Sequence, residues 1–183
     1  MRLFIAGLAL LFTTSASAQS RWTLSAGPEW TPGFMGGRVR GEYDLITPTK
    51  PLRLRLELGA YWEPSQTYAY NYVFLDGGVA GWKQSVDLTF GFSAALTPIP
   101  RARIAPYVTF GVLARQSWKN GSQFFYGGGT TTLSTISGTA GAIVVPLGVG
   151  LRARIAGHMF QVEMRHFRQQ HSTALMVGSN LPF

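Results

Sequence analysis

Residues 52–62 read Leu-Arg-Leu-Arg-Leu-Glu-Leu-Gly-Ala-Tyr-Trp, an alternation of apolar with charged or small side chains. Successive side chains of a β-strand point to opposite faces. The stretch therefore predicts one apolar face that ends at Trp62 and a second face that carries Arg53, Arg55 and Glu57. A helix would scatter the same side chains around its axis, so this stretch is expected to form a strand.

The same period of two recurs along the chain, in segments of roughly ten residues separated by turn residues. No apolar run reaches the roughly 20 residues that a membrane helix requires, which excludes a helical membrane protein. Repeated alternating segments of this length are typical of outer-membrane barrels. The sequence predicts an all-β fold, an eight-stranded antiparallel up-and-down transmembrane β-barrel, with strands in the segments 21–30, 38–45, 52–62, 85–96, 103–115, 143–152, 160–165 and 175–183.

Composition excludes several other classes of protein. Of the 183 residues, 46% are hydrophobic, 13% are charged and none is cysteine, which excludes a disordered chain, a coiled coil and a disulfide scaffold. The formal net charge of +8 would suit nucleic acid, but most arginines fall on one face of the predicted strands rather than in an exposed stripe. We therefore expect no nucleic-acid partner.

The N-terminus has the three regions of a secretory signal peptide. Arg2 supplies the positive charge, residues 3–12 form an apolar run too short to span a bilayer, and Ala16-Ser17-Ala18 is a small-residue cleavage site. We expect residues 1–18 to be a cleaved signal peptide and residues 19–183 to form the barrel.

The polar face of the predicted strands carries nine arginines and six acids, and the apolar face carries no charge. An arginine on the lipid face costs about 2–4 kcal/mol at the bilayer midplane, so the charges fix the register. The interior of an eight-stranded barrel is just wide enough to be filled by side chains, so we expect a plug of ion pairs; a gated anion path is the alternative. Besides Arg21 and Glu29 near its ends, the expected network contains Arg38, Arg40, Glu42, Asp44, Arg53, Arg55, Glu57, Asp87, Arg103, Arg115, Arg152, Glu163 and Arg165.

A water-soluble ligand-binding barrel would show the same alternation turned inside out. Ten-residue strands tilted near 40° span roughly 25 Å, the height of an outer-membrane apolar band. Aromatic residues such as Trp22 and Trp62 lie near segment ends, where interfacial girdles are expected. The long connections 63–81 and 119–137 alternate with tight turns, as extracellular loops do with periplasmic turns. The sequence therefore favours the membrane, with the soluble barrel as a further alternative.

Three segments resemble strands five to seven of the OmpA-like and OmpX-like small outer-membrane barrels. They are Arg-Ile-Ala-Pro-Tyr-Val-Thr-Phe-Gly-Val from residue 103, Leu-Gly-Val-Gly-Leu-Arg from residue 147 and Val-Glu-Met-Arg-His-Phe from residue 162. The chain also ends on Phe183, which looks like the C-terminal β-signal that the barrel-assembly machinery recognises, although Pro182 departs from that pattern. The resemblance implies the bacterial outer membrane, periplasmic termini, contact with lipid and lipopolysaccharide, and no cofactor. A closed barrel has no edge that demands a partner, so a monomer is expected.

The long connections hold the candidate binding residues. Tyr68, Tyr70, Tyr72 and Phe74 repeat the period of two beyond the membrane band, which predicts an aromatic hairpin outside the membrane with an adhesive or ligand-binding edge. Packing of these rings on one another or on lipid headgroups is the alternative. The Gly-, Thr- and Ser-rich segment 119–137 is expected to be a mobile loop. The expected function is a structural or surface-interaction role.

An enzymatic alternative rests on His166. Its position resembles that of the His-x-Ser-Asn motif of PagL-type lipid A deacylases, which are also eight-stranded barrels. Arg168 and Gln169 stand where that motif has serine and asparagine, and no acid follows Glu163. Ser172 is the remaining candidate nucleophile for a divergent lipid A hydrolase. The three histidines, without cysteine or a nearby acid, predict no metal site.

Overall fold

The structure is a computed structural model that describes residues 21–32, 34–46, 50–72, 77–127, 130–155 and 158–181, with the side chains of 34 and 70–72 outside the description. Among these residues every regular element is a β-strand except one 3₁₀ turn, η1 (Arg168–Gln170). Within the described ranges, no helix is long and apolar enough to cross a bilayer. The strands are β1 (Trp22–Thr31), β2 (Phe34–Asp44), β3 (Leu52–Tyr72), β4 (Gly77–Leu96), β5 (Ile104–Gly127), β6 (Thr130–Val144), β7 (Pro146–Ile155), β8 (His158–Phe167) and β9 (Ser172–Asn180).

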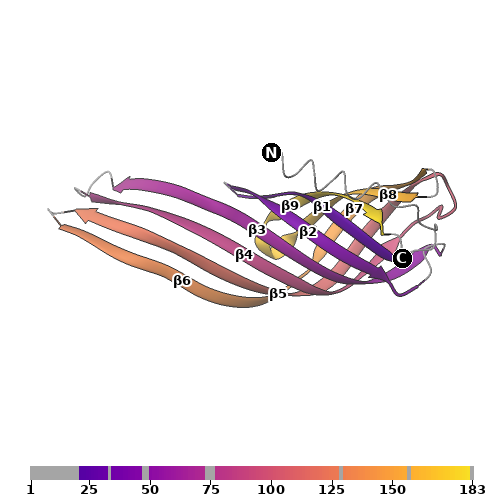
Figure 1. Ribbon diagram of the computed structural model, residues 1–183, viewed down its shortest axis with the longest axis horizontal. Helices are drawn as coiled ribbons and strands as arrows, with labels where there is room; N and C mark the ends of the chain where they lie inside the picture. The colour runs from indigo at the N-terminus through magenta and orange to yellow at the C-terminus, as the bar shows by residue number, and fades with distance from the viewer. Residues whose placement is uncertain are drawn as a thin grey trace.

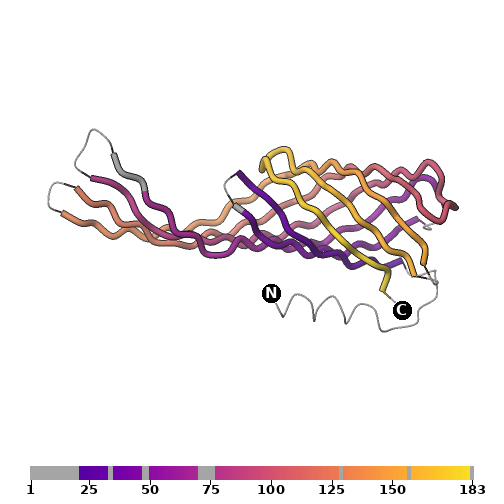
Figure 2. Tube along the Cα trace, turned by 90° about the horizontal axis from the view of Figure 1, so that it is seen from above, coloured from indigo at the N-terminus to yellow at the C-terminus, as the bar shows by residue number. Residues whose placement is uncertain are grey.

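All strand pairs are antiparallel, and they close a ring. Neighbours along the chain pair with one another from β1 to β5, β5 pairs with β7, and the series continues through β8 and β9. The ring closes where β9 pairs with β1, from Thr23 opposite Asn180 to Trp30 opposite Thr173. This antiparallel closed ring confirms the predicted up-and-down barrel (Figures 1 and 2).

β6 and β7 are two parts of one strand. Leu113 of β5 pairs with Val144 of β6, and Phe110 pairs with Leu147 of β7, so the same register runs through both parts. The ladder is interrupted at Val145, directly before Pro146, which has no backbone N–H to donate. With β6 and β7 taken together, the ring has the eight strands that the sequence predicts.

Burial alternates along the strands and is inverted relative to a water-soluble protein. In β3, Arg53, Arg55 and Glu57 are buried, whereas Leu54 and Leu58, on the opposite face of the strand, are 43% and 61% exposed. β4 repeats the pattern, with Phe90 and Phe92 exposed and Thr89 buried. The charged face therefore lines the lumen and the apolar face forms the outer wall, the arrangement of a transmembrane β-barrel.

β3, β4, β5 and β6 continue far beyond the barrel as a four-stranded antiparallel sheet (Figure 2). The expected hairpin of strands three and four is half of this sheet. The expected loop 119–137 is wrong: residues 119–127 belong to β5, and residues 130–137 belong to β6 and pair with β5. Thr favours β-strands, and β6 pairs with β5, which is itself an extended strand. Composition alone does not predict this pairing.

Candidate functional site

Glu163 of β8 is the central acceptor of the lumen. It is fully buried and receives both terminal nitrogens of Arg40, at 3.2 and 3.0 Å, and the Nε of Arg165 at 2.6 Å. The hydroxyls of Tyr107 and Thr109 donate to the same carboxylate at 3.1 and 3.0 Å. One acid thus joins donors from β2, β5 and β8, and it ties opposite parts of the wall together.

A second group of ion pairs lies beside Glu163. Arg165 donates to both oxygens of Glu57, at 2.6 and 3.0 Å. Arg55 pairs with Glu42, and the amide of Gln161 donates to the other Glu42 oxygen at 2.7 Å. Bidentate and charge-assisted hydrogen bonds are the strongest available to a buried carboxylate. The two groups form one network, because Arg40 also contacts Glu42 at 3.4 Å.

Further pairs lie toward the two ends of the lumen. Arg53 donates to Asp44 at 3.2 Å, at the end of the barrel where β1 begins and β9 ends. At the other end, Arg38 pairs with Glu29, and Arg115, whose side chain is 21% exposed, donates to Asp87 at 2.6 Å. Ion pairs therefore occupy the lumen along most of its length.

The charge balance inside the barrel is closer to neutral than the sequence suggests. Arg103 is a correction to the expected network: it lies exposed in the turn before β5, and its carbonyl accepts the backbone N–H of Arg154. Arg21 is likewise exposed, directly before β1. Arg21 and Arg103 each lie before the first residue of a strand, so the alternation of side chains along the strand does not orient them toward the lumen. Among the described residues, the buried acids are Glu29, Glu42, Asp44, Glu57, Asp87 and Glu163, and the arginines are Arg38, Arg40, Arg53, Arg55, Arg152 and Arg165 with the partly buried Arg115.

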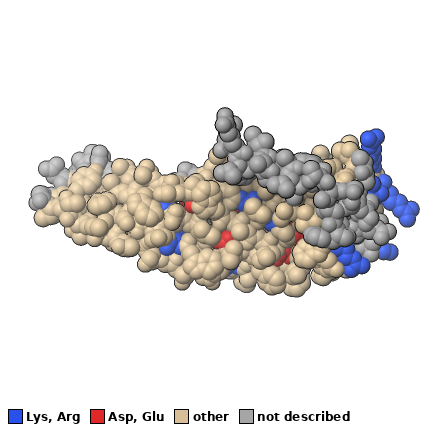
Figure 3. Space-filling view, viewed as in Figure 1, with Lys and Arg blue, Asp and Glu red and all other residues tan. Residues whose placement is uncertain are grey.

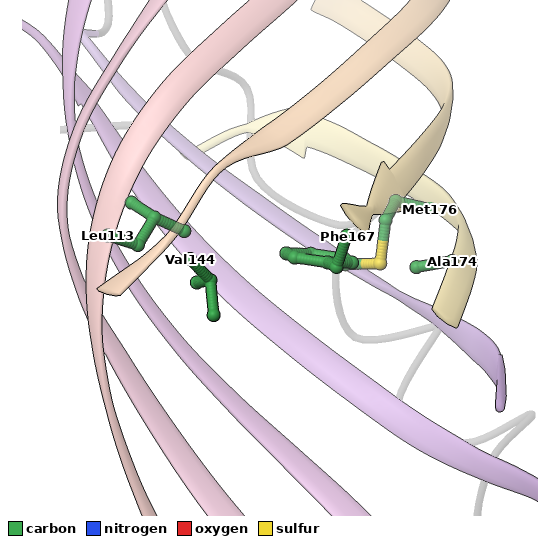
Figure 4. Close-up of a cluster of buried hydrophobic side chains, with 5 residues drawn as sticks. All are labelled: Leu113, Val144, Phe167, Ala174 and Met176. Carbon is green, nitrogen blue, oxygen red and sulfur yellow. The ribbon is translucent and has the colours of Figure 1, made fainter. Parts of the chain in front are cut away.

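An apolar cluster lies in the lumen among the ion pairs of the outer end. Leu113, Val144, Phe167, Ala174 and Met176 are each at most 2% exposed and come from β5, β6, β8 and β9 (Figure 4). The guanidinium of Arg38 lies 4.3 Å from the centroid of the Phe167 ring, so the cluster adjoins the network. Sequence reasoning missed this cluster; its signal is the inward parity of Ala174 and Met176, which carry no charge.

His166 and Ser172 lie on opposite sides of the barrel wall. His166 is exposed on the outer surface, and its Nδ1 lies 3.2 Å from Oγ1 of its cross-strand neighbour Thr173. Ser172 is buried in the lumen and donates to Glu29 at 2.7 Å. The structure does not bring these two residues together. Across the described part of the chain, no cluster of His, Cys, Asp or Glu is suited to a metal ion.

The candidate tyrosines lie on the protruding sheet. The β3–β4 register shifts between Glu63 and Gln66, and beyond the shift Tyr68 pairs with Gly81. The Tyr68 hydroxyl donates to Gln123 of β5 at 3.2 Å, across the strand that separates them. This shift places Tyr68 on the face that continues the lumen side, whereas the sequence places it on the apolar side. Tyr70 and Tyr72 belong to β3 by their backbone, and Phe74 and Phe183 lie outside the described residues.

The protruding sheet and the opposite end of the barrel differ in charge. Lys and Arg gather at the end of the barrel away from the sheet, while the visible face of the sheet beyond the barrel shows almost no charge (Figure 3). Exposed residues of that basic end include Lys50, Arg101 and Arg154. The sheet bears Thr, Ser and Gly with exposed aromatic and aliphatic side chains, among them Phe124 and Leu133. The exposed surface of the sheet is therefore mostly uncharged.

Comparison with known proteins gives structural likenesses only. No family model and no curated protein matches the chain. A major outer membrane protein of Thermus thermophilus matches at 15% identity over 86% of this chain and 96% of its own, with a TM-score of 0.45. Neisserial surface protein A matches at 15% over 93% and 100%, with a TM-score of 0.41, and Ail, the attachment invasion locus protein of Yersinia pestis, at 11% over 88% and 97%, with a TM-score of 0.39. These TM-scores are all below 0.5, so the assignment of a barrel fold depends on the strand pairing of this chain.

Proposed function

We propose that this protein is an integral β-barrel of the bacterial outer membrane, with a plugged lumen and a surface-interaction role carried by its protruding sheet. The observation that carries the proposal is the inverted burial. Leucine, valine and phenylalanine side chains cover the outer wall while arginines and acids fill the interior. Exposed apolar area of this extent needs a lipid environment.

The orientation follows from the two ends of the barrel. The turns between β2 and β3, β4 and β5, and β7 and β8 are short and lie at the basic end. The long β3–β4 and β5–β6 hairpins extend from the opposite end. Outer-membrane barrels have short periplasmic turns and long extracellular loops, which supports a protruding sheet that lies outside the cell. Exposed Lys119 and Arg168 at the outer end suit lipopolysaccharide phosphates.

The lumen supports a structural rather than a conducting role. Side chains occupy the interior of the barrel. They are the ion pairs around Glu163 and Glu42 and the apolar cluster of Leu113, Val144, Phe167, Ala174 and Met176. The adhesive or ligand-contact role therefore falls to the extracellular sheet, and insertion into the membrane would follow the route of the barrel-assembly machinery.

A matched pair of substitutions tests the membrane location. Phe90 on the outer wall and Leu133 on the protruding sheet are both exposed, 52% and 61%. In lipid vesicles, Phe90→Arg should lower the free energy of unfolding by about 2–4 kcal/mol, because the arginine faces hydrocarbon, whereas Leu133→Arg should cost less than about 1 kcal/mol. Urea unfolding followed by tryptophan fluorescence measures both. Equal small effects of the two substitutions would contradict a lipid-facing wall.

A further inference from the structure

β6 has one edge with no partner among the described strands. Residues 130–144 pair with β5, from Gly127 opposite Thr130 to Leu113 opposite Val144. On the other side, β8 first pairs at Pro146, beyond the end of β6. Among the described strands, β6 therefore has one neighbour, and most of its residues are exposed. Backbone N–H and C=O groups on such an edge are a template for an added strand.

The two edges of the protruding sheet differ in protection. The β3 edge carries Glu63 and Pro64 at a register shift, features that discourage strand addition. β6 contains no proline and no charged residue, and its pairing with β5 is regular throughout. In soluble proteins, an edge strand normally carries a lysine, a proline or a bulge that prevents another strand from pairing with it. The β6 edge lacks all three.

The sequence of β6 is suited to pairing with β6 of a second copy of the chain. In an antiparallel pair centred on Ser134, Leu133 would face Thr135 of the other copy, Thr132 would face Ile136, and Thr131 would face Ser137. Every such pair joins a hydroxyl residue with another or with a branched aliphatic side chain, combinations that stabilise sheets. Since β6 carries no charge, no like charges meet.

Symmetry decides the direction of the second copy. A two-fold axis perpendicular to two edge strands makes an antiparallel ladder in which residue i meets j and j meets i. In a parallel ladder the hydrogen bonds join staggered residues, so the two strands are not equivalent. A two-fold axis along the strands therefore cannot relate one strand to the other. The protruding sheet runs along the long axis of the barrel (Figure 1), so an antiparallel partner points the opposite way.

We propose that the β6 edge is a homophilic docking strand that pairs, antiparallel and centred on Ser134, with β6 of a second copy on a facing membrane. The proposal rests on the proposed function, because the sheet must lie outside the cell. It assigns the surface-interaction role to one strand and identifies its partner as this same chain.

A cysteine scan tests the pairing, because the chain contains no cysteine of its own. Two bacterial populations express the full chain with different surface tags and the same single cysteine, at each position from 131 to 137, and are mixed under mild oxidation. Ser134→Cys should give the most disulfide-linked species carrying both tags, since the two Cα atoms would lie about 5 Å apart. Thr131→Cys and Ser137→Cys should give little.

Controls separate the two proposals. A cysteine at Gln66, on the β3 edge, should give no linked species. Surface labelling of the tags and a heat-modifiable band report whether the barrel is inserted with the sheet outside; their absence would overturn the proposed function itself. With both present, no species carrying two tags, or linkage of Ser134→Cys to a different protein, would overturn the docking strand alone.

Charge substitutions give a second readout. Leu133→Lys in one population should reduce mixed clumps by about tenfold, because lysines on the edge must be desolvated. Thr135→Glu in the other population should restore clumping with Leu133→Lys cells, since these residues would face each other. Equal clumping of all four combinations would contradict the register and the proposal.

Discussion

At the scale of single residues, the lumen is organised by carboxylates that each serve several donors. Glu163 receives Arg40, Arg165, Tyr107 and Thr109, so its charge is compensated on every side. A buried ion pair contributes little over an apolar alternative, but removing one partner leaves the other charge uncompensated. Individual acids of this network are therefore expected to be sensitive to substitution.

Replacing Glu163 by glutamine should lower the free energy of unfolding by about 3–5 kcal/mol, because Arg40 and Arg165 lose their shared counter-charge. Urea unfolding in lipid vesicles measures the loss. Glu63→Gln is the matched control: Glu63 lies at the base of the protruding sheet, half-buried, and accepts one hydrogen bond from Ser85. A Glu163 variant as stable as the Glu63 variant would show that the network does not hold the barrel together.

At the scale of strands, alternation predicts which residues face the lumen but not how far a strand extends. Arg53, Arg55 and Glu57 are predictable because a one-residue slip would place charges in lipid. Beyond the barrel this constraint disappears, and β5 and β6 continue through Gly, Thr and Ser residues that lack apolar alternation. The register shift after Glu63, which moves Tyr68 to the other face, likewise has no counterpart in the hydrophobic pattern.

Hydrogen exchange should distinguish the paired and open edges of the protruding sheet. β5 has neighbours on both sides over residues 113–127, whereas β6 has one over residues 130–144. In barrels isolated in detergent, about half of the β6 amides should exchange quickly and the β5 amides slowly, since only alternate β6 amides point toward β5. Uniform protection along β6 would mean that its second edge is covered within one molecule.

At the scale of the whole molecule, the barrel is a closed wall with side chains in its interior and a four-stranded sheet that protrudes from one end. The fold, the side of each strand that faces the lumen, and most of the ion network can be predicted from the sequence. The reason is that a charged side chain that faces lipid destabilises the barrel. The apolar cluster around Phe167 and the open β6 edge depend on which strands meet, and local patterns do not contain that information.

The filled lumen predicts an electrically silent protein. In planar bilayers the wild-type barrel should show no steady conductance, because the Glu163 network and the Phe167 cluster occupy the path. A steady anion-selective current that is lost in Arg53→Ala or Arg55→Ala would instead support a gated anion path.

The fold requires that the apolar face of this barrel point outward into lipid. Refolding of residues 19–183 from urea, in buffer alone and with lipid vesicles, tests it directly through far-UV circular dichroism and the mobility of unboiled samples on gels. We predict a β-sheet spectrum and a heat-modifiable band only when lipid is present. A folded, soluble β-barrel in plain buffer would contradict the account, because the exposed leucines and phenylalanines of the outer wall would then have to face inward.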